Sequence, residues 1–150
     1  MKRILLTVLL AAVCGLVSAQ DALFRKYSDT KGVQTVVISK AMMNLMANVQ
    51  TDEMDISKIA SKLDRLQILN CERPSLVPVI RKDAIEYFRK NKYEEIMNMK
   101  EDGESTVIYM KAHGKGKNEF VLFTYEKDEI SIVNIIGNVT LNDIKKITNN

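Results

Sequence analysis

The sequence has 150 residues, with 22 Lys and Arg against 19 Asp and Glu, and a net charge of +3. Lys2 and Arg3 are the only charged residues among the first 20, so the rest of the chain is almost neutral, with 20 basic and 19 acidic residues. A neutral domain has no general field that would attract nucleic acid or an anionic membrane. Six Gly, two Pro and the absence of any low-complexity stretch exclude a disordered or multi-domain chain.

Residues 1–20 have the pattern of a secretory signal peptide. Lys2 and Arg3 precede the apolar run 4–13, and small residues in 17–19 predict cleavage after Ala19. The apolar run is shorter than the ~20 residues that a membrane span needs. The sequence therefore predicts an exported protein of the periplasm or cell envelope, with one domain over residues 21–150.

Cys14 leaves a second interpretation of this leader open. A lipoprotein signal places a cysteine behind a Leu-small-small triplet, whereas the branched Val13 precedes Cys14 here. Soluble export fits better, and membrane attachment is expected only if Cys14 is lipidated.

Cys71 is the one cysteine after the leader, so the exported domain has no internal disulfide. About 130 residues bury roughly two-thirds of their unfolded surface, which is enough for one domain without such a bond. We expect Cys71 to be a small buried hydrophobe rather than a reactive thiol.

Hydrophobic periodicity predicts eleven elements along the domain. Helices are expected over 21–27, 40–49, 56–63, 75–91 and from Leu141 onward, the last with Thr140 as its N-cap. Strands are expected over 33–39, 65–70, 95–100, 106–111, 120–125 and 130–136. The predicted fold class is α+β: a mostly antiparallel sheet, formed by the C-terminal four-strand meander and two earlier strands, with helices packed on one face.

No motif for catalysis, cofactor binding or a metal stands out. His113 lies in a predicted Gly-Lys turn without a nucleophile elbow nearby, so we expect an exposed loop residue. One His and one Cys cannot form a conventional zinc site. The acidic turn 51–55 lacks the ligand spacing of a calcium loop.

Two clusters are candidate binding residues. Met42, Met43 and Met46 could dock an apolar partner or, less readily, bind Cu(I), although the helical spacing of Met42 and Met46 also fits a helix core. Lys111, Lys115 and Lys117 could form a basic hairpin tip for an anionic partner, although charges in turns are usually only solvated.

Several segments together resemble the family called domain of unknown function 4252, exported proteins of the Bacteroidetes type. The resemblance covers nearly the whole domain and rests mostly on strand, turn and cap patterns in 24–27, 32–33, 36–42, 63–69, 93–97, 100–104 and 135–144. It implies an envelope-associated single domain and supplies no catalytic residues. Within the last segment, we expect Gly137 to provide a positive φ at the end of a strand.

Three functions follow from these observations. The leading expectation is a non-enzymatic binding or protein-interaction module whose sheet edge could pair with an envelope protein. A carrier of an apolar small molecule or lipid is the alternative, and an enzyme with an unrecognised site is the third. The sequence predicts neither a cofactor nor an oligomeric state.

Overall fold

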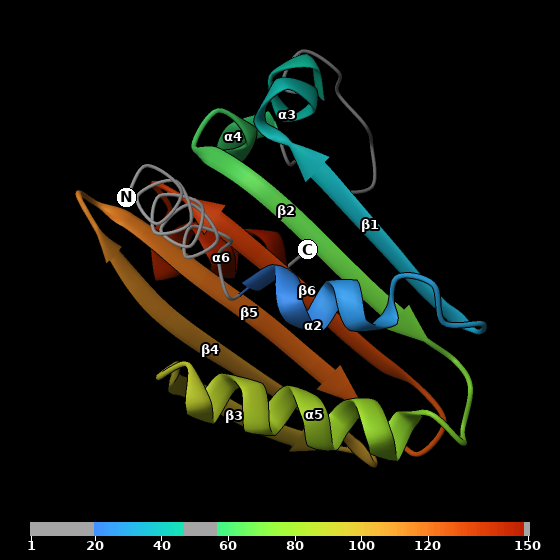
Figure 1. The fold of residues 1–150 in the computed structure, drawn as a ribbon. Helices are drawn as coiled ribbons and strands as arrows, with labels where there is room; N and C mark the ends of the chain where they lie inside the picture. The colour runs from blue at the N-terminus through green and yellow to red at the C-terminus, as the bar shows by residue number, and fades with distance from the viewer. Residues whose placement is uncertain (1–19, 47–56, 149–150) are drawn as a thin grey trace, which may run out of the picture.

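The computed structural model describes residues 20–46 and 57–148 (Figure 1). The order of helices and strands agrees with the sequence prediction. The helices are α2 (Gln20–Tyr27), α3 (Lys40–Met46), α4 (Ser57–Ala60), α5 (Val77–Lys90) and α6 (Leu141–Thr148). The strands are β1 (Val33–Ser39), β2 (Leu63–Cys71), β3 (Glu94–Glu101), β4 (Glu104–Gly114), β5 (Lys117–Tyr125) and β6 (Ile130–Gly137).

All six strands form one antiparallel sheet in the order β1-β2-β6-β5-β4-β3. The C-terminal meander β3 to β6 is present, and β2 joins it by pairing with β6. The α+β class and the mostly antiparallel sheet are therefore confirmed.

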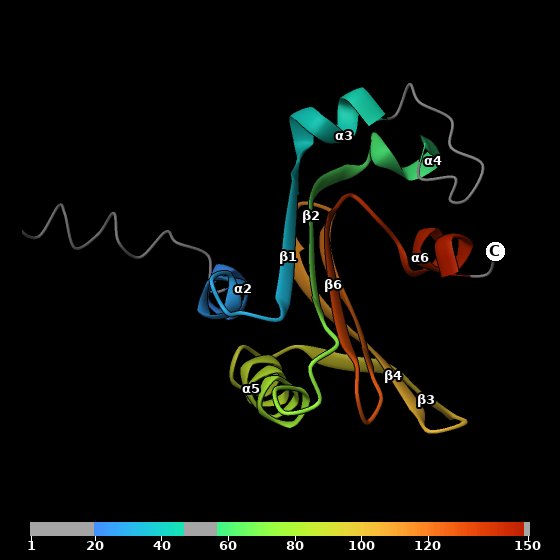
Figure 2. The same ribbon diagram turned by 90° about the vertical axis from the view of Figure 1, so that its right-hand side faces the viewer.

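Helices cover both faces of the sheet, whereas the sequence predicted helices on one face only. Figure 2 shows α2 and α5 on one side of the strands and α4 and α6 on the other. The strands explain this arrangement, because successive side chains point to opposite faces and both sets are apolar in β2, β5 and β6. Each apolar face therefore has to be shielded from water by its own helices.

The face under α2 and α5, which we call the α5 face, holds the larger core. Val77, Ile80, Ala84 and Phe88 are buried on one side of α5, as their spacing predicts. They pack on Phe123 and its neighbours from the central strands. Helix α2 adds Leu23, Phe24 and Tyr27 to this core, and Lys26 of α2 pairs with Asp83 of α5 at 2.6 Å.

The opposite face, which we call the α6 face, holds the second core under α3, α4 and α6. Ile144 of α6 is fully buried there. Thr140 caps α6 as predicted, and Asp143 Oδ2 in turn accepts hydrogen bonds from the Thr140 backbone N–H at 2.9 Å and hydroxyl at 3.0 Å. The Thr140 backbone hydrogen bond and the Lys62 ammonium hold the pKa of Asp143 below its usual range.

Gly137 has a different role from the one that the sequence predicted. Its φ is not among the positive values of the described chain, so backbone freedom is not what this position needs. A Cβ at Gly137 would lie 2.2 Å from the Lys62 carbonyl oxygen and 2.9 Å from Leu63 Cα. Only a glycine lets the end of β6 approach the start of β2 so closely.

We expect Gly137→Ala to lower the free energy of unfolding by about 3 kcal/mol, because two backbones have to move apart. Gly103→Ala is the matched control: Gly103 has φ +87°, and a Cβ there would meet nothing within 4 Å. Gly103→Ala should lower the free energy of unfolding by only about 1 kcal/mol, the cost of placing an alanine at a positive φ. Urea unfolding of both variants measures the difference, and equal losses would contradict the close-approach role of Gly137.

Candidate interaction surface

A continuous row of apolar side chains crosses the α6 face from one edge of the sheet to the other. The strand registers place these residues side by side, one from each strand. We call them the apolar row: Val36, Ile68, Val133, Leu122, Ile108 and Met97.

The described helices of the α6 face cover the apolar row only in part. In the row next to it, Leu66, Ile135 and Phe120 are buried beneath the helices. Within the apolar row, Ile108 is buried at 6% exposure and Ile68, Val133 and Leu122 are half-buried. The two ends are exposed, Val36 at 36% and Met97 at 44%. Figure 2 shows the cause, since α4 and α6 lie only toward one end of the strands.

The next row on the same face is mostly polar and contains Gln34, Asn70, Ser131, Thr124, Thr106 and Met99. Its hydroxyl and amide groups bond across the strands: Ser131 donates to Asn70 Oδ1 at 2.7 Å. We call the apolar row and this polar row together the open face. Apolar contact area beside hydrogen-bonding groups is the composition of a protein interface.

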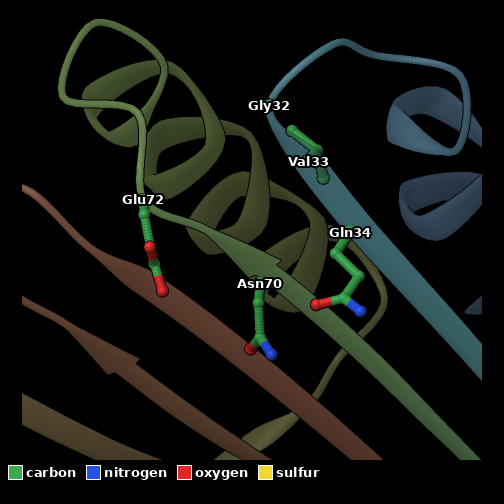
Figure 3. Close-up of a pocket in the computed structure, with 5 residues that line it drawn as sticks. All are labelled: Gly32, Val33, Gln34, Asn70 and Glu72. Atoms are coloured by element: carbon green, nitrogen blue, oxygen red, sulfur yellow. The ribbon is translucent and has the colours of Figure 1, made fainter.

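A hollow of about 330 Å³ lies at the β1 and β2 end of the open face. Figure 3 shows the side chains of Gln34, Asn70 and Glu72 extending in the same direction from neighbouring positions. Two amides and a carboxylate can donate and accept hydrogen bonds, so this corner adds directional polar contacts to the apolar row.

A buried polar cluster lies on the opposite, α5 face. Glu119 of β5 is fully buried, and its Oε1 accepts hydrogen bonds from the Tyr93 hydroxyl and the Asn134 amide, both at 2.6 Å. His113 Nε2 lies 2.6 Å from Glu119 Oε2. The Nζ of Lys111 is 5.2 Å from the centre of the Tyr93 ring.

This cluster is suited to holding strands together rather than to chemistry on a substrate. The Glu119 side chain has no exposed surface, and its hydrogen bonds join the loop before β3 to β4, β5 and β6. Burial, and then the hydrogen bond to Glu119, raises the pKa of the Tyr93 hydroxyl far above its usual value, so Tyr93 stays a donor.

The sequence analysis missed the Glu119 cluster, although one signal was present. Glu119 alternates with Val121 and Phe123, so period two places its carboxylate on the same buried face. An acid at such a position needs partners. Its partners come from residues 6 to 26 positions away, which no local pattern reveals.

His113 is exposed, as expected, but it lies in strand β4 and not in the predicted turn. Strand β4 continues to Gly114, and only Lys115 and Gly116 form the turn before β5. The imidazole is 34% exposed and bonded to Glu119. Cys71 is buried at 1% exposure, as expected.

The methionine cluster is divided between core and surface. Ser39 caps α3 through the Met42 backbone N–H, as predicted. Met43, and not Met42 or Met46, is the fully buried residue, whereas Met42 is 50% exposed and Met46 half-buried. Val49, at the end of the helix predicted over 40–49, lies outside the described residues.

The three lysines of the predicted basic tip have separate surroundings. Lys117 donates to Asp64, which also pairs with Lys40 at 2.7 Å. The hydrogen bonds of Lys117 and Lys40 hold the pKa of Asp64 below its usual range. Lys111 lies over the Tyr93 ring, and Lys115 is exposed in the turn. The structure thus engages two of these lysines in contacts within the domain.

Within residues 20–46 and 57–148, no group of three or more His, Cys, Asp or Glu side chains could hold a metal ion. In the same ranges, no helix is long and apolar enough to cross a membrane.

We expect Tyr93→Phe to lower the free energy of unfolding by about 1.5 kcal/mol, because it removes a buried hydrogen bond to a carboxylate. Tyr109→Phe is the matched control: Tyr109 is half-buried on the same face and stacks on Phe88 at 4.7 Å. Tyr109→Phe should lower the free energy of unfolding by no more than about 0.5 kcal/mol. Urea unfolding at neutral pH compares the two, and equal losses would show that the Glu119 cluster adds no specific stability.

Comparison with known proteins identifies the chain by its family. A crystal structure of PA94, a protein of unknown function from Pseudomonas aeruginosa, aligns with 78% of this chain and 76% of its own, at 8% identity and a TM-score of 0.35. No curated protein matches the sequence. The model of the family described as domain of unknown function, DUF4252, matches residues 27–147. The chain therefore belongs to the DUF4252 family.

Proposed function

We propose that this protein is an exported, non-enzymatic interaction module of the periplasm or cell envelope, and that it binds a protein partner with the open face. The observation that carries the proposal is the apolar row, which crosses all six strands and is exposed at both ends, at Val36 and Met97. Exposed apolar surface that adjoins hydrogen-bonding groups is typical of protein-binding sites.

The leader sequence supports export with cleavage after Ala19. Lys2 and Arg3 precede the apolar run 4–13, and residues 17–19 fit a signal-peptidase site.

The packing under α3 favours protein binding over transport of an apolar molecule. A carrier needs an enclosed apolar cavity. Met43, Phe120 and Ile144 are fully buried in the space between the helices and the sheet. The hollow at the end of β1 and β2 is bordered by amides and a carboxylate instead.

A photo-crosslinking amino acid, p-benzoylphenylalanine, tests the open face in living cells. Placed at Met97 or Thr124, it should give a discrete crosslinked band with an envelope protein, because both positions lie on the open face. At Lys82, which is exposed on α5 on the other side of the sheet, it should give none. Gel analysis and mass spectrometry of the bands provide the measurement.

Val133→Lys gives the matched test of affinity. It places a charge in the middle of the apolar row and should weaken the Thr124 crosslink about tenfold, the loss expected at an interface centre. Crosslinks at Lys82 as strong as those at Met97, or none at either open-face position, would contradict the proposal.

Export is tested by the intact mass of the protein recovered from its own cells. We expect a soluble protein that starts at Gln20 or Asp21, because the leader has the pattern of a cleaved signal peptide. A start at Cys14 with added acyl chains would instead establish a lipoprotein, and an uncleaved chain would contradict both forms of export.

A further inference from the structure

The two edge strands of the sheet differ in their protection against pairing. Strand β3 carries charges at Glu94, Glu95, Lys100 and Glu101, and its register with β4 shifts between Glu95 and Met97. Charges and bulges are the devices that keep an edge strand from pairing with another chain. Strand β1 has the sequence VQTVVIS, without a charge, proline or glycine, and pairs with β2 in one unbroken register.

The free edge of β1 is accessible along the strand. Figure 2 views the molecule from this edge, and no other described strand or helix lies in front of β1. Val36 is 36% and Val37 55% exposed, on opposite faces of the sheet. Every second residue of an edge strand directs its N–H and C=O away from the sheet, and no described strand pairs with this edge of β1.

We propose that β1 pairs antiparallel with β1 of a second copy of this chain, across a two-fold axis at Val36. Val36 is the middle residue of the seven-residue strand, so this register lets every residue of β1 find a partner. It places Val36 opposite the second copy's Val36 and Thr35 opposite the second copy's Val37. The result is one antiparallel sheet of twelve strands.

The chemistry of β1 fits a second copy of itself. Because β1 has no charged residue, the two-fold register brings no like charges into contact. Val36 meets Val36 and Thr35 meets Val37, which are β-branched pairs suited to neighbouring strands. Lys40, which follows β1 directly, is already paired with Asp64 at 2.7 Å.

The same register makes the apolar rows of both copies continuous. Val36 is the outermost member of the row, and its exposed side is the side that the second Val36 would cover. The two-fold axis is perpendicular to the sheet, so both open faces lie on the same side of the dimer. The dimer interface is the free edge of β1, which shares Val36 and Gln34 with the open face. The crosslinking positions of the proposed function, Met97 and Thr124, lie on β3 and β5, so the two proposals are tested separately.

Light scattering coupled to gel filtration tests this dimer. The protein is purified after export, in whichever processed form the cells produce. We expect twice the mass of one chain for the natural sequence. Val36→Lys and Val36→Glu should each raise the dissociation constant at least tenfold, because like charges meet on the axis. An equal mixture of the two variants should restore the dimer, since opposite charges then meet.

Val37→Lys is the control, because it lies opposite Thr35 and not opposite itself. It should keep the dimer. A single-chain mass for the natural sequence would overturn the proposal, as would a dimer that survives both Val36→Lys and Val36→Glu.

A disulfide gives a second measurement that does not depend on charge. Residues directly opposite in antiparallel strands have Cα atoms about 4.5 or 5.5 Å apart, which a disulfide can span. Val36→Cys should therefore form a crosslinked dimer on oxidation. Gln34→Cys should not, because its two copies would lie roughly 13 Å apart along the strands. Equal crosslinking of both, or of neither, would overturn the register.

Discussion

The arrangement of this domain depends on one close contact between backbones. Gly137, at the end of β6, lies against the Lys62 carbonyl, and the next residue, Asn138, donates its N–H to the same oxygen at 2.9 Å. The Lys62 ammonium also bonds Asp143 of α6 at 3.0 Å. The start of β2, the end of β6 and the start of α6 are thus fastened at one point. Helix α6 consequently packs near that end of the strands, and the other end of the same face stays uncovered by the described helices.

The two faces of the sheet are stabilised by different physical means. The α5 face combines aromatic packing around Phe88 with the polar cluster around Glu119. A buried carboxylate is costly unless hydrogen bonds satisfy it, so the cluster requires Tyr93, Asn134 and the central strands to keep one geometry. The α6 face relies on apolar packing at one end only. The fixed geometry of the α5 face therefore holds the strands in place where the described helices leave the α6 face uncovered.

The order of helices and strands could be predicted because it depends on local patterns. Period two marks β4 to β6, helical spacing marks the buried side of α5, and Thr140 and Ser39 mark helix starts. The placement of helices on both faces was not predicted, although β2, β5 and β6 carry apolar side chains on both of their faces. Which helix covers which face depends on the strand pairing, and β2 and β6 pair residues up to 74 positions apart. Gly137 also depends on a distant residue. A glycine at the end of a strand indicates a backbone constraint, but the sequence does not show that the constraint is close approach to the Lys62 carbonyl.

Neither of the two predicted clusters, at Met42 and at Lys111, indicated the open face. Its residues come together only through strand register.

The contrast between the two edges also determines how far the sheet can grow. Pairing through β1 uses the uncharged edge of both copies, so the two outer edges of the dimer are both β3. Each of these carries Glu94, Glu95, Lys100 and Glu101 together with a break in register. An edge of this kind resists further strand addition. A symmetric β1 contact therefore closes after two copies, whereas a contact between β1 and β3 would add copies without end. In the proposed dimer, the charges on β3 are the feature that stops the sheet at two copies.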